Sequence, residues 1–127
     1  MKINQNNAGL EAEKIAATFL INNGLKLVTQ NYHCRYGEID LVMKEADSLV
    51  FVEVRLRSNN QFGSAGASIT AKKQQKLIAT AQHFLQEHDS RSYDSKLYSE
   101  TACRFDAILM NKADLDHIEW VRNAFDA

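Results

Sequence analysis

The sequence contains no proline, so no proline-rich linker divides its 127 residues, and a single domain over residues 1–127 is expected. No apolar run approaches the ~20 residues that a membrane-spanning helix needs. The N-terminal residues lack the apolar core of a signal peptide. Together these absences predict a cytoplasmic protein with no membrane partner.

Cysteine, paired metal-ligand motifs and excess charge are also scarce. The two cysteines, Cys34 and Cys103, form no C-x-x-C motif, and the four histidines form no H-x-x-x-H pair, which argues against a zinc site. Two buried thiols in a reducing compartment are expected instead. The formal net charge of -1 argues against a protein that coats DNA duplexes. A local basic patch can still bind phosphates while acids elsewhere balance the total.

The sequence does contain an orderly series of apolar patterns, with 45% hydrophobic residues. Apolar residues at helical spacing predict one helix over residues 8–23 and another from a cap at Ser68 or Thr70 to about residue 87. Alternating or continuous apolar stretches predict strands over residues 25–34, 38–44, 49–57, 103–110 and 118–125. The resulting order, α-β-β-β-α-β-β, predicts a mixed sheet flanked by helices, an α/β or α+β fold.

The same patterns predict which side chains are buried. In the first helix and the strand after it, the expected buried positions are Leu10, Ile15, Ala16, Phe19, Leu20, Leu25, Leu27 and Tyr32. In the second helix they are Leu77, Ile78, Ala81, Phe84 and Leu85. The polar segments at residues 58–68 and 88–101 are expected to be loops.

The best predicted strands carry acids where apolar residues would be expected. The stretch GEIDLVMKEADSLVFVEVRLR, residues 37–57, reads as a hairpin with Asp40 and Glu53 inside its strands. Because side chains alternate across a strand, Asp40 is expected on the face opposite to Ile39, Leu41 and Met43. The connecting turn is short, so the two strands should pair, and Asp40 and Glu53 would then converge on one side of the sheet.

Two interpretations of these acids remain open from the residues alone. Two carboxylates brought close together repel, and Mg²⁺, which prefers oxygen ligands and takes one or two protein carboxylates, would relieve that cost. A bound metal ion polarises phosphate and activates water, and a neighbouring cation such as Arg55 would stabilise the developing charge. The simpler interpretation is a solvated sheet face with weak cross-strand ion pairs among Glu38, Asp40, Glu53, Arg55 and Arg57.

Six motifs follow one another along nearly the whole chain. They are G-x-x-x-E-x-x-A at Gly9, Glu13 and Ala16, GEIDLVM at 37–43, VFVEVRLRS at 50–58, SITAKKQQKL at 68–77, CRFDAIL at 103–109 and IEWVRNAF at 118–125. With these motifs the sequence resembles the YraN family of bacterial proteins, which is related to Holliday junction resolvases and other restriction-endonuclease-like nucleases. The resemblance implies a restriction-endonuclease-like core, in which a mixed sheet between helices carries a D…E-x-K signature.

The resemblance also implies a site for Mg²⁺ or Mn²⁺. Carried over residue by residue, Asp40 is the first ligand, Glu53 the second, the backbone carbonyl of Val54 completes the site, and Glu13 from the first helix assists. Arg55 stands where the wider superfamily usually has lysine. Because arginine stays protonated, Arg55 is expected to clamp a phosphate or position a water and not to accept a proton.

The activity implied by the resemblance is metal-dependent hydrolysis of phosphodiester bonds, in DNA rather than RNA, by a structure-selective endonuclease for branched, junction or flap DNA. Phosphate contacts position a backbone without reading bases. The candidate contacts are Arg35, Arg57, Lys72, Lys73, Gln74 and Lys76. For Lys73, a solvated first helical turn is an equally good interpretation. Resolvases of this type often act as dimers, so a homodimer is an expectation carried over from them.

Two other functions remain open. One is a nucleic-acid-binding accessory domain of the same fold that cuts slowly or not at all. The other is a protein-interaction module that uses the Trp120 end and the polar loop at residues 58–66. For Trp120 and Phe125, a role in packing is expected rather than stacking on bases. For Asp106, a structural role is expected rather than a chemical one. Glu38 is either a further acid near the site or part of the turn that enters the strand.

Overall fold

A computed structural model of the chain describes residues 5–57, 69–91, 102–111 and 114–126. The helices are α1 (Gln5–Asn22) and α3 (Ala71–Arg91), and the strands are β1 (Lys26–Cys34), β2 (Gly37–Glu45), β3 (Ser48–Arg57), β4 (Cys103–Asn111) and β5 (Asp114–Phe125). The predicted order α-β-β-β-α-β-β is therefore confirmed. The loop predicted at 58–68 and most of the second loop lie outside the described residues.

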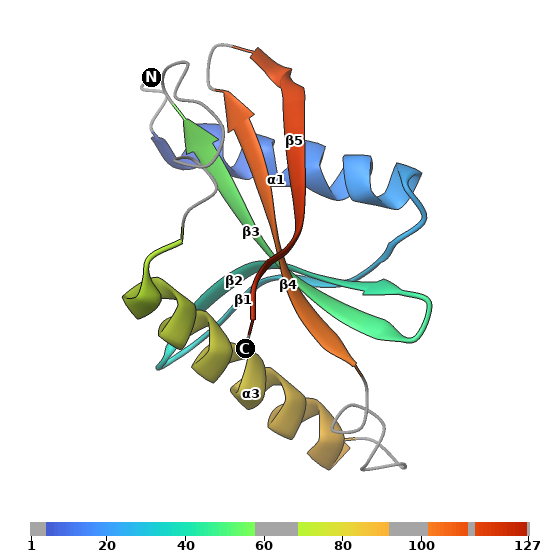
Figure 1. Ribbon diagram of the computed structural model, residues 1–127, viewed down its shortest axis with the longest axis vertical. Coiled ribbons are helices and arrows are strands. Elements are labelled where there is room, and N and C mark those ends of the chain that lie inside the picture. Colours follow the sequence, from blue (N-terminus) through green and yellow to red (C-terminus); the bar gives the residue numbers. More distant parts are fainter. Residues whose placement is uncertain (1–4, 58–68, 92–101, 112–113, 127) are drawn as a thin grey trace.

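The five strands form one mixed sheet in the order β1-β2-β3-β4-β5. Neighbouring strands are antiparallel except β3 and β4, which run parallel and are joined through α3. Figure 1 shows the twisted sheet with α1 and α3 on its two sides. This α+β architecture is the restriction-endonuclease-like arrangement that the resemblance implies, and β1 and β5 are its edge strands.

The face under α1 is held by small helix residues. Ala12, Ala16 and Leu20 are at most 1% exposed, and they pack in one cluster with Leu41, Met43, Val50, Val52, Ile108 and Met110 from the sheet. Leu10, expected in the same stripe, is 53% exposed. It lies two residues from Ala12 and so on the far side of the helix.

The face under α3 is richer in aromatic side chains. Leu77, Ala81 and Phe84 are buried against a cluster of sheet residues, and Ile78 and Leu85 pack against its margin, as the helical spacing predicts. The sheet residues of this cluster are Ile39, Val42, Leu49, Phe51, Phe105, Ala107, Leu109 and Phe125. Thr70 caps the helix, because its hydroxyl oxygen accepts the backbone N–H of Lys73 at 3.2 Å.

Two predictions about burial in the sheet are wrong. Leu27 is 40% exposed, because a register shift between Leu27 and Thr29 turns Val28 toward the α3 cluster instead. The two thiols are not buried either: Cys34 is half-buried, Cys103 is exposed, and neither is in a disulfide.

Alternation holds in β3 but breaks in β2 at Asp40. In β3, Leu49 and Phe51 pack under α3 while Val50 and Val52 pack under α1, as strand alternation requires. In β2, Leu41 and Met43 pack under α1, but Ile39 packs under α3 together with Val42. The expectation that Ile39 shares a face with Leu41 is therefore wrong, and the irregularity falls on the acid.

Among the described residues, neither helix is long and apolar enough to cross a membrane.

Candidate functional site

The site begins where β2 and β3 separate. Their paired register ends at Leu41 and Val52, so the next residues, Asp40 and Glu53, are not ladder partners. The side chain of Asp40 bridges the gap, because its Oδ2 accepts the backbone N–H of Val54 at 2.8 Å. This bond satisfies an amide that the open fork would otherwise leave unpaired. It also fixes the Asp40 carboxylate between the strands.

Glu53 points from the fork toward the start of α3. Its Oε2 lies 3.8 Å from the Nζ of Lys73, and its side chain is only 13% exposed. Glu53, Val54, Arg55, Thr70 and Lys73 line a surface pocket of about 390 Å³, with Leu56 as the sixth lining residue. The pocket therefore joins one carboxylate of the fork to two cations and to the N-terminal end of a helix.

Glu13 approaches the fork from α1. One of its carboxylate oxygens, Oε1, is buried and has no hydrogen-bond partner among the described residues. Burial and the nearby charge of Glu38 raise the pKa of Glu13, while hydrogen bonding from Asn31 and Asp40 opposes the rise. The charge of Glu13 in turn raises the pKa of Asp40, so a cation near both carboxyl groups would favour their ionised forms.

The pKa of Asp40 is raised to about 7. Burial is the main cause, and the charges of Glu53, Glu13 and Glu38 add to it, while the hydrogen bond from Val54 acts in the opposite direction. Burial also raises the pKa of Glu53, against the lowering effect of Lys73 and Arg55. Four acids from three elements thus share one electrostatic environment, and Glu38 is part of it although its side chain is exposed. The charges that act on Asp40 are therefore predominantly negative.

The residues of the fork suit a hard divalent cation. Asp40 and Glu53 offer oxygen ligands, Oε1 of Glu13 is an acceptor without a donor, and the raised pKa of Asp40 is what excess negative charge produces. Within the described residues, no three His, Cys, Asp or Glu side chains already form a complete metal-binding group. The fit is therefore to an ion that takes two protein carboxylates and fills its other positions with backbone oxygen and water, as Mg²⁺ does.

The predicted phosphate contacts divide into two groups. Arg55 and Lys73 line the pocket beside Glu53. Lys72 and Lys76 are exposed on α3, and Arg35 is exposed on the turn before β2. Two other residues have structural partners. Gln74 donates from Nε2 to the carbonyl of Ile69 at 2.7 Å and so secures the start of α3, and Arg57 pairs with Glu119 of β5 at 3.6 Å.

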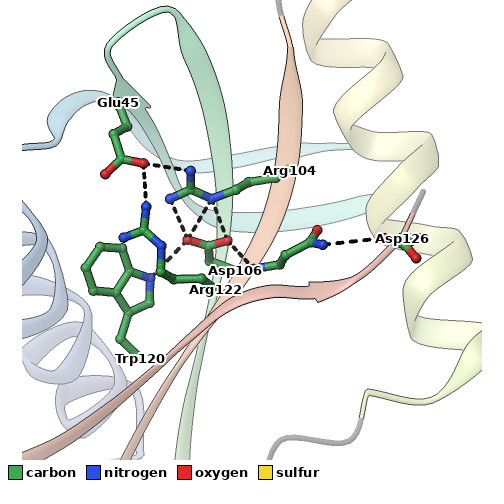
Figure 2. Close-up of polar contacts among 7 residues, drawn as sticks. Glu45, Arg104, Asp106, Trp120, Arg122 and Asp126 are labelled. Atoms are coloured by element: carbon green, nitrogen blue, oxygen red, sulfur yellow. Dashed lines mark hydrogen bonds and ion pairs between the residues drawn. The ribbon is translucent and has the colours of Figure 1, made fainter.

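A second polar centre surrounds Asp106, which the sequence showed only as an acid within a predicted strand. Figure 2 shows Asp106 of β4 surrounded by Arg104, Trp120 and Arg122, with Glu45 bridging the two arginines. The Asp106 side chain is fully buried. It accepts a bifurcated bond from the Nε–H of Arg104 and a second bond from the NH2 of the same guanidinium at 3.1 Å. It also accepts one bond from the Nε1 of Trp120 at 3.0 Å and one from the backbone N–H of Asn123 at 2.8 Å.

The work of Asp106 is structural, as the sequence led us to expect. The pairing of β4 with β5 shifts register between Phe105 and Ala107, and Asn123 opposite has a positive φ of 52°. Asp106 therefore supplies the acceptor that this irregular backbone lacks. Trp120 belongs to the same network and packs on Phe19 and under Arg122, so its predicted role in packing agrees with the structure.

Comparison with known proteins identifies the family. The family described as "Uncharacterised protein family UPF0102" matches residues 12–110. A UPF0102 protein of Methylobacillus flagellatus is 54% identical over 119 residues, which cover 94% of this chain and 96% of that protein. A UPF0102 protein of Nitrosomonas europaea is 51% identical over 120 residues, with 94% of each chain covered. A UPF0102 protein of Legionella pneumophila is 46% identical, again with 94% of each covered.

The chain therefore belongs to the UPF0102 family, which is the YraN family that its motifs resemble.

Proposed function

We propose that this protein is a metal-dependent endonuclease that hydrolyses phosphodiester bonds in branched, junction or flap DNA. The observation that carries the proposal is the fork between β2 and β3. There Asp40 is locked to the amide of Val54, and Glu53 opens into a pocket that also holds Lys73 and Arg55. Acids that repel one another beside a cation-lined pocket suit a metal ion and the phosphate that it would bind.

Asp40, Glu53 and the carbonyl of Val54 are the groups that would hold Mg²⁺ or Mn²⁺, with Glu13 assisting from α1. The chemistry that such an ion supplies is polarisation of a phosphoryl oxygen and activation of a water. Arg55 and Lys73 would hold the phosphate and the charge that develops on it. The first turn of α3 contains no acid, so its dipole also favours an anion in the pocket.

A second candidate function is an accessory domain that binds nucleic acid and cuts slowly or not at all. The ion pair between Lys73 and Glu53 favours it, because that pair offsets part of the charge that would attract a metal ion. Arg55 in place of the usual lysine points the same way, since it cannot accept a proton. Binding of nucleic acid without cutting, at any metal concentration, is the result that this candidate predicts.

The deciding experiment is incubation of the purified protein with labelled flap, four-way junction and duplex DNA, with Mg²⁺, with Mn²⁺ and with EDTA. We expect cutting of the branched substrates that needs metal and disappears in both Asp40→Asn and Glu53→Gln. Glu11→Gln, which alters an exposed acid of α1, is the matched control and should cut normally. Cutting that survives both site substitutions would come from a contaminant and would remove the support for an enzyme.

A further inference from the structure

Tyr36 stands out on the turn that joins β1 to β2. Its side chain is among the few large apolar ones that are well exposed, at 41%. The turn directly precedes β2, so Tyr36 lies two residues before Glu38 and four before Asp40, a path of about 13 Å along an extended chain. An exposed aromatic ring therefore lies on the turn that leads into β2, the strand that contains Asp40.

The ring of Tyr36 is held in place by its neighbours. The guanidinium of Arg35 lies over the ring at 4.9 Å from its centre, and its NH2 donates to the Tyr36 hydroxyl at 2.8 Å. The ring of His83 contacts it edge-on at 6.1 Å between centres. The backbone N–H of Tyr36 donates to the Sγ of Cys34 at 3.4 Å. A ring fixed in this way loses little conformational freedom when it binds a ligand.

The turn itself rests firmly on α3. His83, whose ring contacts Tyr36, is itself held in place: its Nδ1 lies 2.6 Å from the hydroxyl oxygen of Tyr32. The Tyr32 hydroxyl in turn donates to Glu87 at 3.0 Å. Gly37 makes the close approach possible, because a Cβ at this position would meet the Oγ1 of Thr80 at 3.1 Å. The turn that carries Tyr36 is thus attached to α3 as well as to the strands β1 and β2.

Exposed cations connect this turn to the pocket. Lys73 contacts Glu53 at one end, and Lys76, one turn further along α3, borders Gly37. From Lys73 to His83 the helix rises about 15 Å. A polyanion strand whose phosphate occupies the pocket would follow these lysines toward Arg35 and Tyr36. The charge and the aromatic ring therefore fit one ligand, a nucleic-acid strand.

We propose that Tyr36, with Arg35, is a stacking platform for an unpaired base of the strand whose phosphate lies in the fork. The ligand class is DNA with a single-stranded segment, because the faces of paired bases within a duplex are already covered by their neighbours. Stacking on an aromatic ring tolerates every base, so the platform selects for strand structure and not for sequence. This inference rests on the proposed function for the direction of the strand, but its test does not require cutting.

The test is binding of a fluorescent single-stranded oligonucleotide and of a blunt duplex of the same length, in EDTA. We expect Tyr36→Ala to weaken single-strand binding about ten-fold and duplex binding less than about two-fold. Tyr36→Trp should retain single-strand affinity, and the fluorescence of the introduced indole should be quenched when an unlabelled single strand binds. Leu27→Ala is the matched control, because Leu27 has almost the same exposure, 40%, at the other end of the β1–β2 hairpin.

The outcomes separate this inference from the proposed function. Selective loss in Tyr36→Ala supports the platform even if no variant ever cuts DNA, in which case only the endonuclease proposal fails. Equal affinities of wild type and Tyr36→Ala for single strands would overturn the platform, even if the protein cuts with metal. Equal weakening by Leu27→Ala would also overturn it, because any loss of exposed apolar surface would then have the same effect. A protein that binds neither probe in EDTA also overturns the platform, whereas the endonuclease proposal is decided by the cutting assay with Mg²⁺ or Mn²⁺.

Discussion

Asp40 has a structural role and a proposed chemical role, and the two differ in what they require. Its hydrogen bond to Val54 needs only an acceptor oxygen, whereas metal binding needs a full negative charge. The cost of that charge is visible in its pKa of about 7. An amide in place of the carboxylate would keep the first role and remove the second.

Asp40→Asn is therefore expected to lose metal-dependent cutting and to gain stability in EDTA. At neutral pH the gain should be about 1–2 kcal/mol, discounted for the partial exposure of the carboxyl. The new amide can still accept the Val54 N–H through its oxygen and carries no charge to bury. Urea denaturation of both proteins measures the gain. Mn²⁺ should raise the Tm of the wild type and leave that of the variant unchanged.

Arg55 is the residue where this chain departs from the wider superfamily. If it holds the charge that develops on phosphate, Arg55→Ala should lower kcat about 100-fold with a smaller effect on KM. Arg55→Lys should retain more activity than Arg55→Ala, because the ammonium group of lysine keeps the positive charge although it lacks the planar shape of the guanidinium. Steady-state kinetics on the flap substrate measure the separate changes in kcat and KM. A change in KM alone would assign Arg55 to binding.

At the scale of elements, the tip of the β2–β3 hairpin is tied to β5 by charge. Glu45 Oε1 accepts from Arg104 at 2.7 Å and from Arg122 at 2.8 Å, and these two arginines hold the pKa of Glu45 below its ordinary value of 4.5. A lowered carboxyl pKa adds stability that is fully present above the ordinary value. That stability is lost as the pH falls through the folded-state pKa.

Glu45→Gln should therefore lower the Tm by about 2 °C at pH 7, and the difference from wild type should close as the pH falls below the ordinary glutamate pKa. Thermal unfolding from neutral to acidic pH, in EDTA, follows the difference. Asp47→Asn, an exposed acid of the same turn, is the control and should show no such closure. A difference that persists at low pH would mean that packing, and not charge, connects the hairpin to β5.

The elements were predictable from sequence because their apolar patterns are strong, and the errors fall where a strand is irregular. Alternation gave the correct faces for β3, which is regular, but misplaced Ile39 in β2 and Leu27 in β1, where the chain slips. That Asp40 and Glu53 both come directly after the last pair of the β2–β3 ladder follows from the short hairpin turn. The bond from Asp40 to Val54 does not, because it depends on the strands separating. The bonds to Asp106 likewise depend on a register shift between β4 and β5 that no local pattern reveals.

The whole molecule carries a formal charge of -1, so any attraction for a polyanion must come from where its charges lie. Lys73 of α3 lines the pocket, and Lys72 and Lys76 are exposed on the same helix. Exposed acids such as Glu11 and Asp116 lie on other elements. Binding driven by such a patch weakens as salt rises, in proportion to the number of phosphates contacted.

Lys72→Ala and Lys76→Ala should each reduce the slope of log affinity against log salt, by about 0.7 for a single-stranded probe. Lys14→Ala, an exposed lysine of α1, should leave the slope unchanged. Fluorescence anisotropy over a range of salt concentrations measures the slope. Affinity that does not depend on salt at all would instead favour the protein-interaction module.

The parallel pairing of β3 with β4 has a consequence for the order in which the chain assembles. Strands β1, β2 and β3 are joined by short turns and can pair early, whereas β4 must wait for the long connection through α3 to close. Asp40 and Glu53 are therefore brought into one hairpin while water still surrounds it, so the repulsion between their charges is weak at that stage. Their charges become costly only when both helices settle onto the sheet, so the penalty is met at the last step of folding.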